Sequence, residues 1–121
     1  MSILVANLLS SRAKKFGSSE QSQDFQQIFL DAVNYALDDI DRTLGLTTDR
    51  VVGTNDAIDL NQQLYEAALM MGIDYYIADF GAWTVQNLEG IERKYKRKLD
   101  LLHMTYAKTI DLSAKFGDLS D

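Results

Sequence analysis

The chain has 121 residues, of which 46% are hydrophobic and 25% charged, values that fit one folded domain and exclude general disorder. It contains no cysteine, which excludes disulfides, thiolate nucleophiles and cysteine-ligated zinc and fits synthesis in a reducing compartment. It also contains no proline, which favours long helices, and its net charge of −6 argues against a nucleic-acid-binding protein with a basic face.

Residues 1–16 have apolar positions at helical spacing, and we expect an amphipathic first helix there. The basic residues Arg12, Lys14 and Lys15 follow the apolar ones, which is the reverse of the order in a signal peptide. No apolar run approaches the ~20 residues that a membrane-spanning helix needs, so we expect no membrane partner. The polar stretch 17–23 then separates this helix from the next.

The clearest helical pattern covers residues 24–44. Ser22 or Asp24 can cap its start, and Gly45 stands where a left-handed residue often ends a helix. Its apolar residues recur at steps of three and four and predict one buried face: Phe25, Ile28, Phe29, Ala32, Val33, Ala36, Leu37, Ile40 and Leu44.

An acidic cluster, Asp38-Asp39-Ile40-Asp41, lies inside this predicted helix and suggests a calcium site. From Asp39 the spacing matches an EF-hand loop for three positions, but Leu44 stands where glycine is required. Carboxylates on successive helix positions also point in different directions. We therefore interpret the cluster as a solvated acidic face.

Residues 46–59 form the one long irregular stretch, within which Arg50-Val51-Val52 could make a short strand. A connection of this length is longer than most and is often functional or ordered by a partner. We expect Arg50, Val51 and Val52 to contribute to a protein interface.

Two further helices are expected over 60–80 and 84–116, followed by an acidic tail over 117–121. Asp59 can cap the first, whose apolar line is Leu60, Leu64, Ala67, Ala68, Met71, Tyr75 and Ala78, and Gly81 can end it. The second has a stripe of near-heptad spacing: Leu88, Ile91, Tyr95, Leu99, Leu102, Tyr106 and Ile110. We therefore expect an all-α fold over 1–121, a single-domain bundle of about four helices with a long C-terminal helix and one long irregular loop.

No residue pattern predicts catalysis, a metal site or a cofactor. His103 is the only histidine, and neither a cysteine nor a second histidine is present to form a metal site with it. Nucleotide-binding glycine loops, nucleophile elbows and H-E-x-x-H are all missing from the sequence. We expect a protein that acts by binding, and an enzyme with scattered site residues is the least favoured alternative.

A basic run on the last predicted helix is the main candidate for a binding surface: Arg93, Lys94, Lys96, Arg97 and Lys98. These residues spread around most of the helix, leaving Ile91, Tyr95 and Leu99 on a narrow packing edge. The run can be a solvated face, a docking surface for an acidic partner or a neighbouring subunit, or, less readily in an acidic chain, a contact for DNA phosphates.

Aromatic residues gather near the junction of the last two helices, in Tyr75-Tyr76 and Phe80-Gly-Ala-Trp83. Adjacent tyrosines on a helix cannot both face one core, so we expect one of them to be exposed or at an interface. Tyr76 and Trp83 are our candidates for interface residues.

Several segments follow one another in a characteristic order over residues 24–116. They are the helix Phe29-Leu-Asp-Ala-Val-Asn-Tyr-Ala-Leu-Asp-Asp-Ile-Asp41, the irregular Thr48-Asp-Arg-Val-Val-Gly-Thr-Asn-Asp-Ala-Ile-Asp-Leu60, and then Tyr65-Glu-Ala-Ala-Leu69, Gly72-Ile-Asp-Tyr-Tyr76 and a long charged helix. This order resembles the head–tail connector (adaptor) proteins of tailed bacteriophages. It is a likeness of pattern and order, and no catalytic residue is implied.

The resemblance implies a helical protein of the virion neck, made in the host cytoplasm, commonly with twelve copies in a ring. Such a ring binds the portal protein on one side and a stopper or tail protein on the other, and DNA passes through it without specific binding. Net negative charge suits a channel wall along which DNA slides. The alternative is a cytoplasmic helical adaptor or regulator outside any virus, in which the near-heptad stripe makes a dimer.

Overall fold

The computed structural model describes residues 2–59, 63–81 and 88–116. Within them the chain forms β1 (Ser2–Leu4), α1 (Val5–Lys15), α2 (Gln23–Leu44), β2 (Ala57–Asp59), α3 (Gln63–Phe80) and α4 (Leu88–Phe116). The predicted all-α fold with four helices is confirmed, with only one small two-stranded sheet beside the helices. The predicted helix starts at 60–62 and 84–87 and the tail at 117–121 lie outside the described residues.

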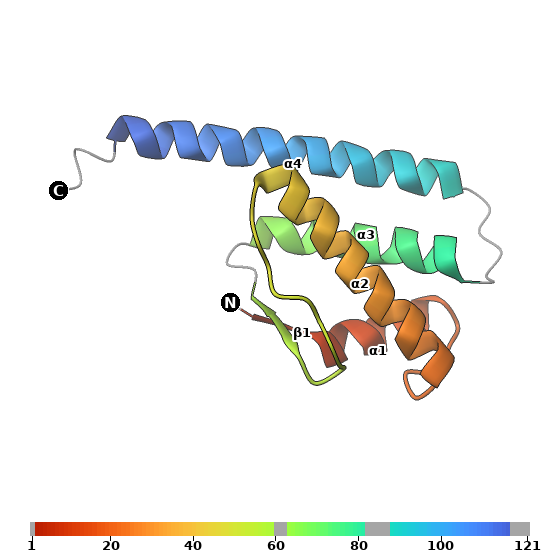
Figure 1. Ribbon diagram of the computed structural model, residues 1–121. Helices are drawn as coiled ribbons and strands as arrows, with labels where there is room; N and C mark the ends of the chain where they lie inside the picture. The colour runs from red at the N-terminus through yellow and green to blue at the C-terminus, as the bar shows by residue number, and fades with distance from the viewer. Residues whose placement is uncertain (1, 60–62, 82–87, 117–121) are drawn as a thin grey trace.

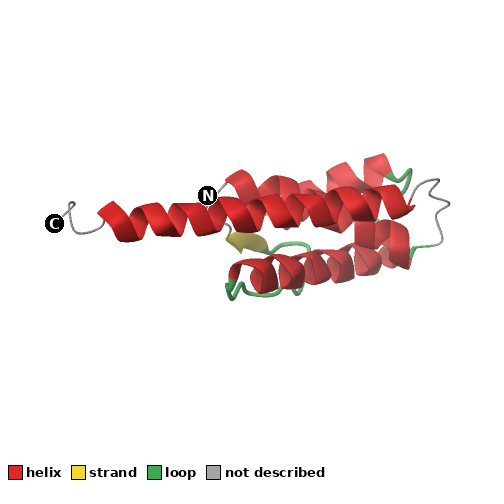
Figure 2. Ribbon diagram, turned by 90° about the horizontal axis from the view of Figure 1, so that it is seen from above, coloured by secondary structure: helices red, strands yellow, loops and turns green. Residues whose placement is uncertain are grey.

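The helices are arranged around α2. Figure 1 shows α3 and α4 side by side, α2 crossing them, and α1 with the small sheet on the side away from α4. Both views show the C-terminal part of α4 projecting beyond the other helices (Figures 1 and 2). One end of α4 is therefore packed on the bundle, while the other extends from it.

The N-terminal residues differ from their prediction. Instead of one helix over 1–16, Ser2–Leu4 form β1, which pairs antiparallel with β2 so that Ile3 lies opposite Ile58. The predicted strand at Arg50-Val51-Val52 is also wrong, because the strand in this connection is Ala57–Asp59. Each strand is only three residues long and depends on a partner distant in sequence, which local periodicity does not reveal.

α2 begins and ends where its sequence predicts. The Ser22 side chain accepts a hydrogen bond from the Phe25 backbone N–H at 3.3 Å, and Gly45 has φ 68° and ψ 32° in the left-handed region. Asp24 in the first turn and Arg42 in the last complement the helix dipole. Of the nine apolar residues predicted for the packing face, only Ile28 is not fully buried.

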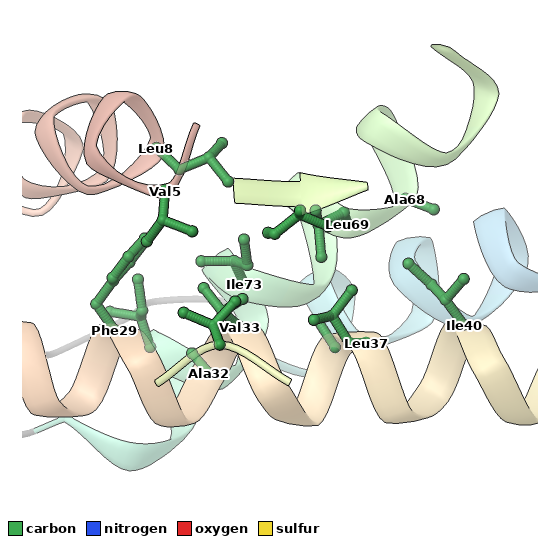
Figure 3. Packing of buried hydrophobic residues seen from close by; sticks show 14 of the residues in the cluster. Val5, Leu8, Phe29, Ala32, Val33, Leu37, Ile40, Ala68, Leu69 and Ile73 are labelled. Carbon is green, nitrogen blue, oxygen red and sulfur yellow. The ribbon is translucent and has the colours of Figure 1, made fainter. Parts of the chain in front are cut away.

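Side chains from α1, α2 and α3 form the core (Figure 3). Val5 and Leu8 of α1 approach Phe29 and Val33 of α2 from one side, while Leu69 and Ile73 of α3 pack against α2 further along (Figure 3). The strand residue Ile58 is also almost completely buried. The small sheet therefore covers one end of the helical core.

The buried face of α3 is only partly the one predicted. Ala68 and Ala78 are buried as predicted, but Ala67 is exposed and Met71 and Tyr75 are only half-buried. Further residues are buried that were not predicted: Tyr65, Leu69, Gly72, Ile73 and Ile77. Apolar residues occur on most sides of this helix, so periodicity alone does not select one face. The close approach of Tyr95 and Ala36 to Gly72 favours the face observed.

Candidate protein-interaction surface

The N-terminal half of α4 is attached to α2 and α3 through two buried side chains, Tyr95 and Leu102. The Tyr95 ring lies directly over Gly72 of α3. A Cβ atom at Gly72 would be 2.8 Å from Tyr95 Cζ and Oη and 2.9 Å from the Ala36 Cβ atom. These distances are shorter than van der Waals contact, so α2, α3 and α4 meet here only because residue 72 has no side chain.

Asp39 of α2 joins the three helices through hydrogen bonds. Its Oδ2 atom accepts from the hydroxyl of Tyr76 at 2.5 Å and from that of Tyr95 at 2.9 Å. The Arg42 guanidinium lies 3.8 Å from the other carboxylate oxygen. Tyr75 is close to the same group, with ring centroids 5.0 Å from Tyr76 and 6.0 Å from Tyr95. The cluster orients α4 on α2 and α3.

The tyrosines of this cluster resist deprotonation. Burial, followed by the hydrogen bond and negative charge of Asp39, raises the pKa of Tyr76 well above its usual range. Burial and then Asp39 raise the pKa of Tyr95 further still. Burial, with a smaller contribution from Glu92, also raises the pKa of Tyr75. All three hydroxyls therefore keep their protons to a higher pH than an ordinary tyrosine does, and remain hydrogen-bond donors there.

One prediction about this region is corrected. The acidic cluster is not a solvated face, because Asp41 is only 7% exposed and Asp39 accepts two tyrosine hydroxyls. The sequence pattern did not reveal these contacts because the donors come from segments distant in sequence. Tyr76 is half-buried and donates to Asp39, and Tyr75 is half-buried as well. The assignment of Tyr76 to a protein interface stays a prediction.

The loop 46–59 is bound to α2 by polar contacts. Asp41 accepts from the backbone N–H of Thr48 at 2.9 Å, from its hydroxyl at 2.7 Å, and from Arg50 Nη1 at 3.0 Å. Arg50 also forms an ion pair with Asp38. The charge of Arg50 is thus largely engaged within the chain, which weakens its candidacy as an interface residue.

Asn34 binds the middle of the same loop. Its side-chain amide donates to the Val51 carbonyl at 2.9 Å and accepts from the Val51 N–H at 2.8 Å. The Val51 side chain is buried in the core, so its prediction as an interface residue is wrong. Val52, in contrast, is 88% exposed, and Asp56 accepts from its N–H at 2.7 Å. Only Val52 of the three predicted loop residues presents an apolar side chain to solvent.

The basic run lies on the surface of α4, because burying unpaired charged side chains is unfavourable. Arg93, Lys94, Lys96 and Arg97 are exposed and Lys98 is partly exposed. Lys96 pairs with Glu92 at 2.7 Å, which raises the pKa of Lys96 and lowers that of Glu92. Among the described residues, the other four cations have no carboxylate within ion-pair distance. Their charge is available to a partner.

Two exposed apolar residues of α4 were not anticipated. Leu101 is 53% exposed and Met104 is 68% exposed, both on the helix one or two turns after the basic run. Both lie outside the predicted apolar stripe of this helix, and this position could have indicated that they are exposed. Of the predicted interface residues, Trp83 alone lies outside the residues that the structure describes. We define the α4 surface as Arg93, Lys94, Arg97, Lys98, Leu101 and Met104.

His103 is exposed on α4. In the part of the chain that the structure describes, no three histidine and acidic side chains are grouped so that they could share a metal ion. No helix within the described ranges is both long enough and apolar enough to cross a lipid bilayer.

Comparisons with known proteins do not assign the chain to a family. No family model, no curated protein and no solved structure matches it. The function is therefore inferred from the geometry and chemistry of the chain and from the likeness of its sequence pattern to the connector proteins.

Proposed function

We propose that the protein is a structural component of a tailed-phage neck, a head–tail connector that forms a ring below the portal and links it to a tail or stopper protein. The likeness of residues 24–116 to that family supports this proposal, as does the helical fold that the family implies. Its location would then be the virion neck, and it would act by binding without catalysis.

The projection of α4 is the observation that carries the proposal (Figures 1 and 2). The helix is fixed to the bundle by Tyr95 and Leu102, and beyond them it extends away from α2 and α3. A projecting helix with exposed Leu101 and Met104 offers apolar area that another chain can bury. A protein that must contact several neighbours at once needs such a surface.

Charge supports contact between copies. Four cations of the α4 surface have no ion-pair partner among the described residues, while exposed carboxylates occur on other elements, including Asp24, Asp31, Glu66 and Asp79. Opposite charges on different faces attract neighbouring copies and set their orientation. A contact between different faces is of the kind that closes rings. The net charge of −6 also disfavours tight binding to passing DNA.

The exposed apolar residues of α4 favour one second candidate, a helical adaptor outside any virus that dimerises through this helix. Leu101 and Met104 would then pack against the same residues of a second copy. The two candidates differ in stoichiometry, because a dimer closes at two copies and a neck ring requires more.

The test is to purify the chain with the portal protein encoded near it and to measure the mass of the complex by light scattering. We expect many copies per portal assembly, and replacing Arg93, Lys94, Arg97 and Lys98 with Glu should abolish the association while leaving the melting temperature unchanged. A chain that forms only dimers, with or without portal, would contradict the connector function. Unchanged association of the substituted chain would exclude the α4 surface.

A further inference from the structure

A cavity of about 290 Å³ is lined by side chains from the end of α1, from α3 and from α4. Three of these side chains are apolar and three are charged: Phe16, Met71 and Ile91, and Lys15, Asp74 and Lys94. This volume suits one apolar side chain of a bound segment and is at the small end for an independent organic ligand. The cavity adjoins the α4 surface through Lys94.

The rim of the cavity has a surplus of positive charge. Arg12 Nη1 contacts both oxygens of Asp74 at 2.9 and 2.8 Å, and Lys15 Nζ lies 2.6 Å from one of them. Two cations therefore share a single carboxylate, and the exposed Lys94, which also lines the cavity, adds a third positive charge. Lys98 lies one helical turn further along the same side of α4.

An apolar cavity with a cationic rim selects an acidic segment that contains one apolar anchor. The chain itself contains such a segment after α4: Gly117-Asp-Leu-Ser-Asp121. Leu119 is its only large apolar residue, and Asp118 and Asp121 flank it. The anchor matches the apolar wall, and the two carboxylates match the cationic rim.

This segment cannot reach the cavity of its own chain. α4 is continuous from Leu88 to Phe116, so at 1.5 Å per residue its end lies about 33 Å along the helix from Lys94. Five residues extend at most about 18 Å.

We propose that residues 117–121 of one copy dock in the cavity between α1, α3 and α4 of a second copy, with Leu119 as the anchor. Donor and acceptor are then different faces of the chain, so successive copies join head to tail and close into a ring or extend as a filament. The inference deepens the proposed function and rests on the self-assembly that it requires.

Binding of a labelled peptide to the full-length chain tests the cavity directly. A fluorescein-labelled peptide with the sequence of residues 117–121 is titrated with the protein at low ionic strength, where charge attraction is least screened, and fluorescence anisotropy is measured. We expect saturable binding, weakened roughly tenfold when Leu119 in the peptide is replaced by Ser. Absence of binding, or equal binding of the two peptides, overturns the proposal.

Two protein variants with the same charge change locate the binding position. Lys94→Glu should weaken peptide binding roughly tenfold, whereas Arg93→Glu should not, because the neighbouring side chain points about 100° away on the helix. Equal losses in both variants would indicate general attraction to a basic surface and would overturn the docking site. Their melting temperatures serve as the folding control.

Assembly on the portal separates this inference from the proposed function. If the full-length Leu119→Ser variant joins the portal as many times as the unmodified chain, the tail does not link copies, and the connector function stands without it. If the variant loses association although the peptide does not bind a second copy, the tail contacts another component, which also overturns the inference. Peptide binding without any portal association would instead remove the connector function alone.

Discussion

The loop 46–59 and the helix α4 are both rich in charged residues, yet they use them differently. In the loop, Arg50 and Thr48 contact Asp38 and Asp41, so the polar groups are bound within the chain. On α4, the cations Arg93, Lys94 and Arg97 face solvent. A charged segment that lies against α2 is used for folding, whereas cations on the side of α4 that faces away from α2 and α3 are free for a partner.

The difference depends on where α2 lies. α2 passes between the loop and α4, and its carboxylates point to both sides: Asp41 toward the loop and Asp39 toward Tyr95. Arg93, Lys94 and Arg97 flank Tyr95 on α4 but lie on its exposed side, and no carboxylate of α2 is within ion-pair distance of them. Substitutions in the loop and on the buried side of α4 test this contrast.

Gly72→Val tests whether α4 is fixed at its buried end. The added side chain would overlap the Tyr95 ring and the Ala36 Cβ atom, so we expect the free energy of unfolding to fall by about 3 kcal/mol. Urea denaturation measures this change. Gly53→Ala is the matched control, because a Cβ atom there meets nothing within 4 Å. Equal stability of the two variants would show that α3 and α4 do not approach as closely as described.

Asp41→Asn tests whether the loop is bound by its charges. The substitution weakens the acceptor for Thr48 and Arg50 at a nearly buried position, and we expect a loss of about 2 kcal/mol in unfolding free energy. Asp49→Asn, at an exposed position of the same loop, should change little. Similar losses in both variants would place the effect in net charge, not in the contacts of Asp41.

Tyr95→Phe removes one hydroxyl from Asp39 while keeping the ring that packs on Gly72. We expect a loss of about 1 kcal/mol in unfolding free energy at neutral pH, the usual value for one hydrogen bond. Tyr35→Phe is the control, since that side chain is 53% exposed. A larger loss than in Gly72→Val would contradict the view that packing dominates the attachment of α4.

The same tyrosines make stability depend on pH in the alkaline range. Their pKa values are raised in the folded chain. Their contribution to the free energy of unfolding is therefore fully present at pH values below 10.0, the ordinary tyrosine pKa. Above it the unfolded chain loses protons that the folded chain keeps, and stability falls as pH rises. Chemical denaturation from about pH 9 to about pH 11, one unit on either side of the ordinary tyrosine pKa, should show this fall in stability. The fall should be smaller in Tyr95→Phe, which lacks one of the titrating hydroxyls.

Lys96→Gln should have the smallest effect. The pair with Glu92 is a solvent-exposed contact between residues four apart on a helix, and such pairs contribute little to stability. We expect a melting temperature indistinguishable from that of the unmodified chain, by differential scanning calorimetry. A clear decrease would mean that this side of α4 is more enclosed than the structure describes.

Local sequence patterns predicted α2 best, because each of its determinants lies within a few residues. Ser22 and Gly45 set its ends, and the apolar residues between them set its buried face. Prediction failed where the deciding contact was distant in sequence. β1 needs β2, and the interface prediction for Val51 did not include the contact with Asn34 seventeen positions earlier.

Only part of the candidate surface could be predicted, again because local patterns do not reveal contacts between residues distant in sequence. The cations of α4 are adjacent in sequence, so their exposure followed from composition, and Val52 is exposed as expected. The hydrogen bond of Tyr76 was not predicted, because Asp39, its acceptor, lies on another helix. The cavity at Lys94 combines residues of three helices and has no local signal at all.

The sequence by itself determined the helical class, the ends of α2 and the concentration of basic residues on α4, since periodicity, capping and charge act over a few residues. Only the tertiary structure decided which charges are used within the chain and which remain on its surface. That choice depends on distances between groups far apart in sequence: Arg50 meets the carboxylates of Asp38 and Asp41 on α2, whereas Arg93, Lys94 and Arg97 lie on the side of α4 that faces solvent.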